Sequence, residues 1–156
     1  MADPTIAQRE LHVRSLEYNG LTWVDIADPS KAEMKFLGEH YPFHPLHLED
    51  CLSWVQLPKL DKFQDYLFLV LHFPIFNKKV RITTPSQVSV FVGAKYVVTV
   101  HQGNLSPLTK FFVECQESEA SRRQHMSHSS GRLLYHILDG LIDNCFPILN
   151  AISRKV

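Results

Sequence analysis

The sequence has few of the features that identify several common protein classes. Its three cysteines, Cys51, Cys115 and Cys145, are an odd number without paired spacing. A disulfide framework normally needs an even set, so free thiols in a reducing compartment are expected. The six glycines form neither a phosphate-binding loop nor a nucleophile elbow. These shortages argue against a disulfide scaffold and against chemistry that depends on either glycine motif.

Excess charge and long apolar runs are also missing. The 156 residues include 16 basic and 16 acidic side chains, so the net charge is zero with histidine neutral. Without a basic field, nucleic acid and anionic membrane surfaces are not expected partners. Residues 1–10 lack the regions of a signal peptide. No stretch approaches the roughly 18 apolar residues that span a bilayer. The chain as given is therefore expected to be soluble.

Patterns typical of strands and helices alternate along the chain. A hydrophobic content of 45% is normal for one globular domain with its own core. The run Tyr66–Leu71 is apolar without alternation, which predicts a strand at the centre of a sheet, buried on both faces between helices. The polar stretch 117–130 predicts that the preceding helix fades there. Strands are predicted at 11–18, 21–26, 58–63, 66–71, 87–92 and 96–100, and helices at 28–41, 45–53, 106–115 and 134–152.

The last helix has the clearest apolar periodicity, from Leu134 to Ile152. Pro147 lies inside the pattern and predicts a kink or bend. The sequence ends at Val156 without a glycine stop signal. We therefore interpret the chain as a fragment cut inside or just after a helix.

The adjacent carboxylates Glu49 and Asp50 are the first candidate for chemistry. On a helix that begins at Pro45 they lie in the second half, where negative charge opposes the helix dipole by about 0.3–1 kcal/mol. Adjacent carboxylates are suitable ligands for a hard cation such as Mg²⁺ or Ca²⁺. The alternative is an ordinary solvated helix face, and spacing alone favours that alternative.

Asp139 and Asp143 are the second candidate, because four residues place them one turn apart on one helix face. His136 falls near the same stripe. Like charges at this spacing repel by a few tenths of a kcal/mol unless a cation or partner lies between them. A solvent-exposed face again explains the spacing better when it is considered alone.

Two further possibilities carry less weight. His40, His44 and His47 suggest a structural zinc site, but Pro45 begins a new helix and separates them, and no H-E-x-x-H motif is present. A cysteine nucleophile is conceivable in principle. All three cysteines lie at apolar helical positions, however, where a small buried side chain is the default interpretation.

Three ordered blocks go beyond generic patterns. They are H-P-L-x-L-E-D at 44–50, Q-L-P-K-L at 56–60 continued by D-Y-L-F-L-V-L-H at 65–72, and L-L-Y-x-I-L-D-x-L-I-D at 133–143. Together with the segment around Trp23 and the Asp28-Pro29 helix start, they resemble the N-terminal cytoplasmic domain of the CorA family of magnesium channels. The resemblance covers roughly residues 20–156.

The resemblance implies an α/β/α sandwich with a mixed parallel and antiparallel sheet. It implies a cytoplasmic funnel-wall domain at 1–128 and, at 129–156, a helix leading toward a stalk. The full-length protein would be a homopentamer at the cytoplasmic side of the membrane, which it would reach only through helices C-terminal to Val156. The fragment itself is expected to be monomeric or weakly associated.

The resemblance also implies weak regulatory Mg²⁺ sites at subunit interfaces. Asp50 corresponds to the main acid of such a site, with Glu49 beside it, and Asp139 to the acid of the later helix. Asp143 and His136 are weaker candidates. The family's partner for the Asp50 position lies on a long helix beyond Val156, so this chain would hold half of that site, with or without bound Mg²⁺.

The expected function is therefore a non-enzymatic, Mg²⁺-sensing regulatory domain of a magnesium and cobalt channel. The Gly-Met-Asn signature and both membrane helices of the family are absent from these 156 residues, so this chain alone is not expected to conduct ions. One alternative is the cytosolic domain of a zinc transporter of the same superfamily. Another is a soluble metal-dependent enzyme using Glu49, Asp50 and nearby histidines.

Overall fold

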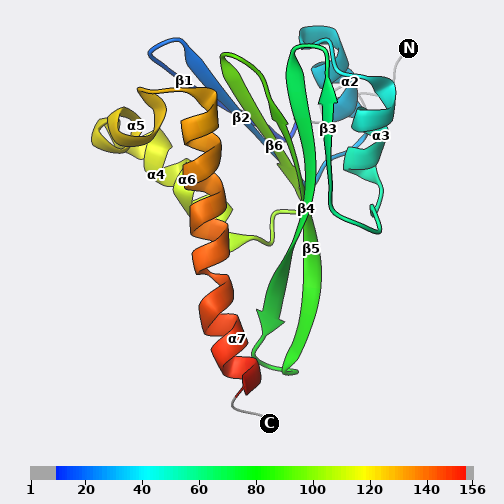
Figure 1. Cartoon of the computed structure of the whole chain (residues 1–156), viewed down its shortest axis with the longest axis vertical. Coiled ribbons are helices and arrows are strands. Elements are labelled where there is room, and N and C mark those ends of the chain that lie inside the picture. Colours follow the sequence, from blue (N-terminus) through cyan, green and yellow to red (C-terminus); the bar gives the residue numbers. More distant parts are fainter. Residues whose placement is uncertain (1–9, 154–156) are drawn as a thin grey trace.

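The sheet contains six strands, and its pairing is mixed (Figure 1). The computed structural model describes residues 10–153. The strands lie in the order β1-β2-β6-β5-β4-β3. Only the β2–β6 pair is parallel, and the other four pairs are antiparallel. Their bounds are β1 Val13–Tyr18, β2 Leu21–Ala27, β3 Lys59–Phe63, β4 Tyr66–Asn77, β5 Ile82–Val92 and β6 Tyr96–His101.

Helices cover both faces of this sheet, which confirms the predicted α/β/α sandwich. One face carries α2 and α3, and the other carries α4, α5 and α6, with α7 continuing toward the end of the long β4–β5 hairpin (Figure 1). The helix bounds are α2 Lys31–His40, α3 Pro45–Leu52, α4 Ser106–Glu117, α5 Glu119–Met126, α6 Ser130–Asp143 and α7 Cys145–Ser153. In residues 10–153 no helix is both long enough and apolar enough to span a bilayer.

Two apolar clusters hold the layers together, one on each face. Successive strand residues point to opposite faces, so Trp23 packs with Phe112 of α4 whereas Val24 packs with Leu37 of α2. Phe43, between α2 and α3, stacks on Phe91 of β5 with ring centroids 3.9 Å apart. This double-sided burial fixes which helices lie on which side.

The prediction that Tyr66–Leu71 forms the centre of the sheet is wrong. It begins β4, which lies second from the edge beside β3, while β5 and β6 are central. The prediction of burial on both faces is also wrong, because Phe68 is fully buried but Leu67 and Leu69 are only half-buried. Helix α7 contacts β4, and Leu67, Leu69 and Leu71 pack against the apolar cluster of the α4–α6 side while remaining partly exposed.

The polar stretch after α4 contains a helix that periodicity did not predict. Ser118 caps α5 by accepting a hydrogen bond from the amide of Ser121, and Glu119 in the first turn suits the helix dipole. Met126 is the one fully buried apolar side chain that α5 provides. A single apolar anchor produces no helical repeat, so periodicity missed α5, although α4 does end at Glu117 as expected.

The bend predicted at Pro147 is present as a break between two helices. Helix α6 ends at Asp143 and α7 begins at Cys145, with Asn144 between them. Pro147 lies in the first turn of α7, where its missing N–H costs little, and its ring would collide with the carbonyl of Asp143 in a continuous helix. The boundary expected near residue 128 falls between α5 and α6 and stays a prediction.

Candidate metal site

Helix α3 carries the first predicted acids, and its two ends are held by side chains. His44 caps the N-terminus, with Nδ1 accepting from the amide of Leu46 at 3.0 Å. At the other end, the buried Gln87 of β5 donates from Nε2 to the carbonyl oxygens of Asp50 and Ser53, at 3.2 and 2.9 Å. Its Oε1 accepts from the amide of Val55 at 2.7 Å. Gln87 therefore fixes the backbone that positions Asp50.

The Asp50 carboxylate is half-buried and already bound to a cation of the same chain. Nζ of Lys59, at the start of β3, lies 2.6 Å from Oδ2 of Asp50 and 3.4 Å from Oδ2 of Asp61. The hydrogen bond from Lys59 to Asp50 raises the pKa of that lysine, so it carries its charge throughout the physiological range. Glu49, by contrast, is exposed to solvent.

A chain of hydrogen bonds supports Asp61 from the core side. The hydroxyl of Tyr66 accepts from the amide of His44 and lies 2.8 Å from Nδ1 of His47. The hydroxyl has a single proton, and we assign that proton to the hydrogen bond with Nδ1 of His47. The imidazole proton then lies on Nε2, which donates to Asp61 at 3.2 Å. Burial lowers the pKa of His47, although Asp61 opposes the shift.

The second set of predicted residues lies in the opposite layer. Asp139 and Asp143 are exposed on α6, and His136 is half-buried against His125 of α5, with ring centroids 4.6 Å apart. Helices α3 and α6 lie on opposite faces of the sheet (Figure 1). One copy of the chain therefore does not bring Asp50 and Asp139 to a common ion.

The donor set on the α3 face is incomplete for a metal. The described residues contain no group of three His, Cys, Asp or Glu side chains that could hold an ion. Asp50 is a suitable hard donor, but one of its oxygens is occupied by Lys59. This arrangement also lacks the closed, three-ligand pocket that a metal-dependent enzyme at Glu49 and Asp50 would require.

The histidines near α3 have other roles. His44 caps the helix and His47 belongs to the Tyr66–Asp61 chain. Nδ1 of His40 lies 2.8 Å from the carbonyl oxygen of Phe36 in its own helix. These bonds account for the histidines without the zinc site that their spacing suggested.

The three cysteines are free thiols. Burial raises the pKa of Cys51 to about 12 and that of Cys115 to about 11. Both remain protonated at neutral pH, whereas a nucleophile needs the thiolate. The interpretation as small buried side chains is confirmed for Cys51 and Cys115, whereas Cys145 is only half-buried.

Sequence reasoning missed the lysine and glutamine that shape this surface. The sequence places Lys59 and Asp61 only in the strand predicted at 58–63, where polar and apolar residues alternate. Their spacing of two places both on one face of β3, and that face meets α3. The alternation could therefore have predicted the contact, but nothing in the pattern singled out Gln87.

A second buried network also went unpredicted. Asp25 of β2 is fully buried, and its Oδ1 accepts from Thr99 and His101, both at 2.7 Å. Its Oδ2 accepts from Arg14 at 2.9 Å. Nδ1 of His101 accepts from the amide of Gly103, so the ring is assigned as neutral with its proton on Nε2. This network joins the β1, β2 and β6 strands.

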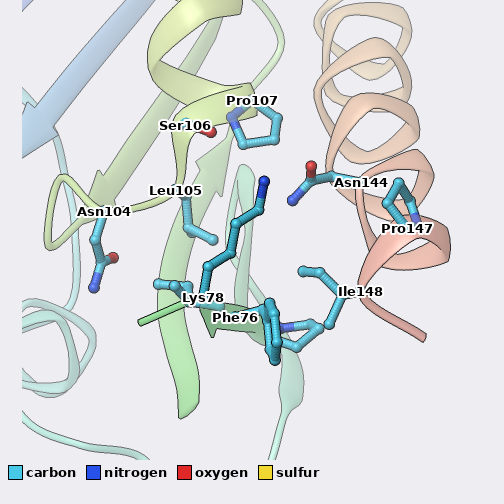
Figure 2. Close-up of a pocket in the computed structure, with 11 residues that line it drawn as sticks. Phe76, Lys78, Asn104, Leu105, Ser106, Pro107, Asn144, Pro147 and Ile148 are labelled. Carbon is cyan, nitrogen blue, oxygen red and sulfur yellow. The ribbon is translucent and has the colours of Figure 1, made fainter. Parts of the chain in front are cut away.

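A groove of about 410 Å³ lies between the end of β4, the start of α4 and α7. Figure 2 shows the side chain of Lys78 extending into it between Pro107 and Asn144. None of the predicted acids lines this groove. It is therefore separate from the candidate metal surface.

Comparison with known proteins identifies relatives across nearly the whole chain. The family profile described as CorA-like Mg²⁺ transporter protein matches residues 18–156. The Bacillus subtilis protein YfjQ, whose name describes a metal ion transporter, is 33% identical over 134 residues. That match covers 86% of this chain and 40% of YfjQ. The cobalt/magnesium transport protein CorA of Thermotoga maritima is 28% identical, with 86% and 38% covered.

Solved structures share the fold at lower identity. The soluble domain of CorA from Methanocaldococcus jannaschii superposes with a TM-score of 0.73 at 19% identity, covering 86% of this chain and 52% of that one. The ZntB cytoplasmic domain from Vibrio parahaemolyticus gives 0.66 at 13% identity, covering 89% and 54%. At these identities the likeness establishes the fold alone.

These matches cover most of this chain but only part of each relative. The present chain spans about two fifths of the length of its Bacillus and Thermotoga relatives. The match begins near β2 and includes the α3–β3 surface and both helices α6 and α7. With its sheet order, its two helical layers and a family profile that covers residues 18–156, this chain belongs to the CorA-like Mg²⁺ transporter family.

Proposed function

We propose that this chain is the cytosolic, Mg²⁺-sensing domain of a CorA-type divalent cation channel. The observation that carries the proposal is the family profile across residues 18–156. The names of the relatives, which include a cobalt/magnesium transport protein, support the substrate class. The domain performs no catalysis itself, and its role is to make channel opening depend on cytosolic Mg²⁺.

The proposed mechanism is electrostatic and requires several copies. In the whole protein, a homopentamer, Mg²⁺ bound between subunits screens acids that would otherwise repel. Binding that favours the closed ring shifts the population toward it, and loss of Mg²⁺ releases the subunits and opens the pore. Asp50 supplies one carboxylate, with Glu49 beside it. The exposed Asp139 lies in the opposite layer, with Asp143 one turn further along α6, so only a neighbouring copy could bring the Asp50 position to it.

Reading the gene beyond codon 156 is the first test. A channel requires membrane spans, so two apolar segments are expected downstream, with Gly-Met-Asn before the second. A stop codon directly after Val156 would contradict the channel proposal and leave only the family membership of the domain.

Protease protection of the whole transporter tests the sensing role. Raising MgCl₂ should slow cleavage, because the metal-bound ring is the closed state. Asp50→Asn removes one ligand charge and should raise the midpoint Mg²⁺ concentration by at least about tenfold. Asp65→Asn, an exposed acid in the β3–β4 turn, is the matched control. An unchanged midpoint in Asp50→Asn would exclude Asp50 as a sensor ligand.

A zinc transporter is the alternative within the same fold, as the likeness to ZntB illustrates. An uptake assay on the whole protein with Mg²⁺, Co²⁺ and Zn²⁺ separates the two. Uptake of Mg²⁺ and Co²⁺ is expected. Uptake restricted to Zn²⁺ would transfer the proposal to the zinc branch.

A further inference from the structure

Lys59 occupies the place where a cation would neutralise Asp50. Its ammonium nitrogen lies 2.6 Å from Oδ2 of Asp50, a short charge-assisted contact. The same nitrogen lies 3.4 Å from Oδ2 of Asp61. Two carboxylates from different elements, α3 and β3, thus converge on one positive charge of the same chain.

The surroundings hold that ammonium in place from several sides. Asp61 is oriented by Nε2 of the buried His47, which is in turn fixed by the Tyr66 hydroxyl. The Lys59 ammonium lies 5.7 Å from the centre of the Phe68 ring, within the range of a cation–π contact. The backbone of Asp50 is fixed by Gln87. Both carboxylates are therefore pre-positioned around the lysine, which reduces the entropic cost of the contact.

We propose that Lys59 is a built-in counter-cation that competes with divalent cations for Asp50 and so sets the Mg²⁺ concentration at which this surface responds. The inference rests on the proposed function for the choice of Mg²⁺. A metal ion that takes both oxygens of Asp50 displaces the ammonium, which keeps Asp61 as its remaining partner. Without Lys59, Asp50 and Asp61 face each other uncompensated, and a divalent cation relieves their repulsion directly.

Lys59→Met tests the competition, because methionine keeps most of the apolar stem and removes the charge. The probe is MgCl₂, added to the ¹⁵N-labelled 156-residue chain while the amide signals of α3 and β3 are followed. Half-saturation should occur at a roughly three- to tenfold lower Mg²⁺ concentration than in the wild type, the effect of removing a partly exposed ion pair. Asp50→Asn in the Lys59→Met background should abolish the gain.

Lys62→Met is the matched control. Lys62 lies on the same strand and is exposed, so this variant makes the same change in net charge without altering the carboxylates around Lys59. Its half-saturation should equal that of the wild type. Equal half-saturation in Lys59→Met and the wild type, or an equal gain in both lysine variants, overturns the proposal.

A measurement on the wild type covers the case in which Lys59→Met does not fold. The ¹³Cε signal of Lys59 should move during the MgCl₂ titration as the ammonium leaves Asp50, while that of Lys62 stays constant. A carboxyl signal of Asp50 that moves while Lys59 stays constant contradicts displacement.

The two proposals fail in different ways. If Asp50→Asn shifts protease protection of the whole transporter but Lys59→Met leaves the half-saturation unchanged, the sensing role stands and the lysine competition is wrong. If Lys59→Met binds Mg²⁺ more tightly but Asp50→Asn leaves protease protection unchanged, the competition stands and the sensing role of Asp50 is wrong.

Discussion

At the scale of single residues, the buried carboxylate of Asp25 has the most demanding environment. Burial by itself raises the pKa of Asp25, but the hydrogen bonds from His101, Thr99 and Arg14 outweigh that effect, so the pKa lies below its usual value. Arg14, which faces Asp25 across the β1–β2 register, supplies the permanent positive charge. The edge strand β1 is thus attached to the sheet by an ion pair as well as by its backbone.

Asp25→Asn should reduce the free energy of unfolding by about 3–5 kcal/mol, since it leaves Arg14 and two further hydrogen-bond donors without a carboxylate. Urea denaturation followed by circular dichroism measures the loss. Glu17→Gln, an exposed acid on the same edge strand, should change stability by less than about 0.5 kcal/mol. A loss below about 1 kcal/mol for Asp25→Asn would mean that the network contributes little.

At the scale of elements, the N-terminal caps of α2 and α6 differ in the groups that the capping serine contacts. Ser30 caps α2 by accepting from the amide of Ala32, and its hydroxyl lies 3.0 and 3.1 Å from the two oxygens of Glu33. Glu33 is fully buried. Ser129 caps α6 in the simpler way, by accepting from the amide of Arg132 on an exposed surface.

Ser30→Ala should therefore cost more than Ser129→Ala. Loss of a cap costs about 1 kcal/mol in either case. Ser30→Ala also removes a donor from a buried carboxylate, which adds about 1.5–3 kcal/mol. Thermal and urea unfolding of both variants provide the comparison. Equal losses would show that other groups satisfy Glu33 without the serine.

At the scale of the whole molecule, the sheet separates two helical layers that carry different candidate residues. The α3 layer carries Asp50, which binds Lys59 of strand β3, and the α6 layer carries Asp139. Burial lowers the pKa of His47 in the first layer and of His125 and His136 in the second. These three histidines therefore bind fewer protons in the folded chain than in the unfolded chain just below the ordinary histidine pKa.

Stability should accordingly fall as the pH decreases. Groups with a lowered folded pKa stabilise the fold above their unfolded pKa and lose that contribution as the pH drops toward the folded value. For the three histidines this loss begins near pH 6.5, and for Asp25 it begins near pH 4. Urea midpoints between pH 8 and pH 5 measure the first phase. His125→Gln should reduce the slope, and His40→Gln, at an exposed position, is its control. A midpoint independent of pH would contradict the prediction.

Much of the architecture could be predicted from local patterns. Alternation and apolar runs located all six strands, and the caps and prolines located α2, α3 and the break before α7. Helix α5 was missed because it has only one buried apolar side chain. The position of Tyr66–Leu71 in the sheet was missed because an apolar run does not indicate which strands lie beside it.

The sequence by itself determined the class of fold, the family and the kinds of side chain available for a cation. Those properties depend on residue type and on spacing along the chain. Only the tertiary structure decided that Lys59 binds Asp50, that Gln87 fixes the end of α3, and that Asp50 and Asp139 lie on opposite faces of the sheet. Each of these results joins elements distant in sequence, and such contacts follow from strand order and helix placement, which hydrophobic periodicity does not encode.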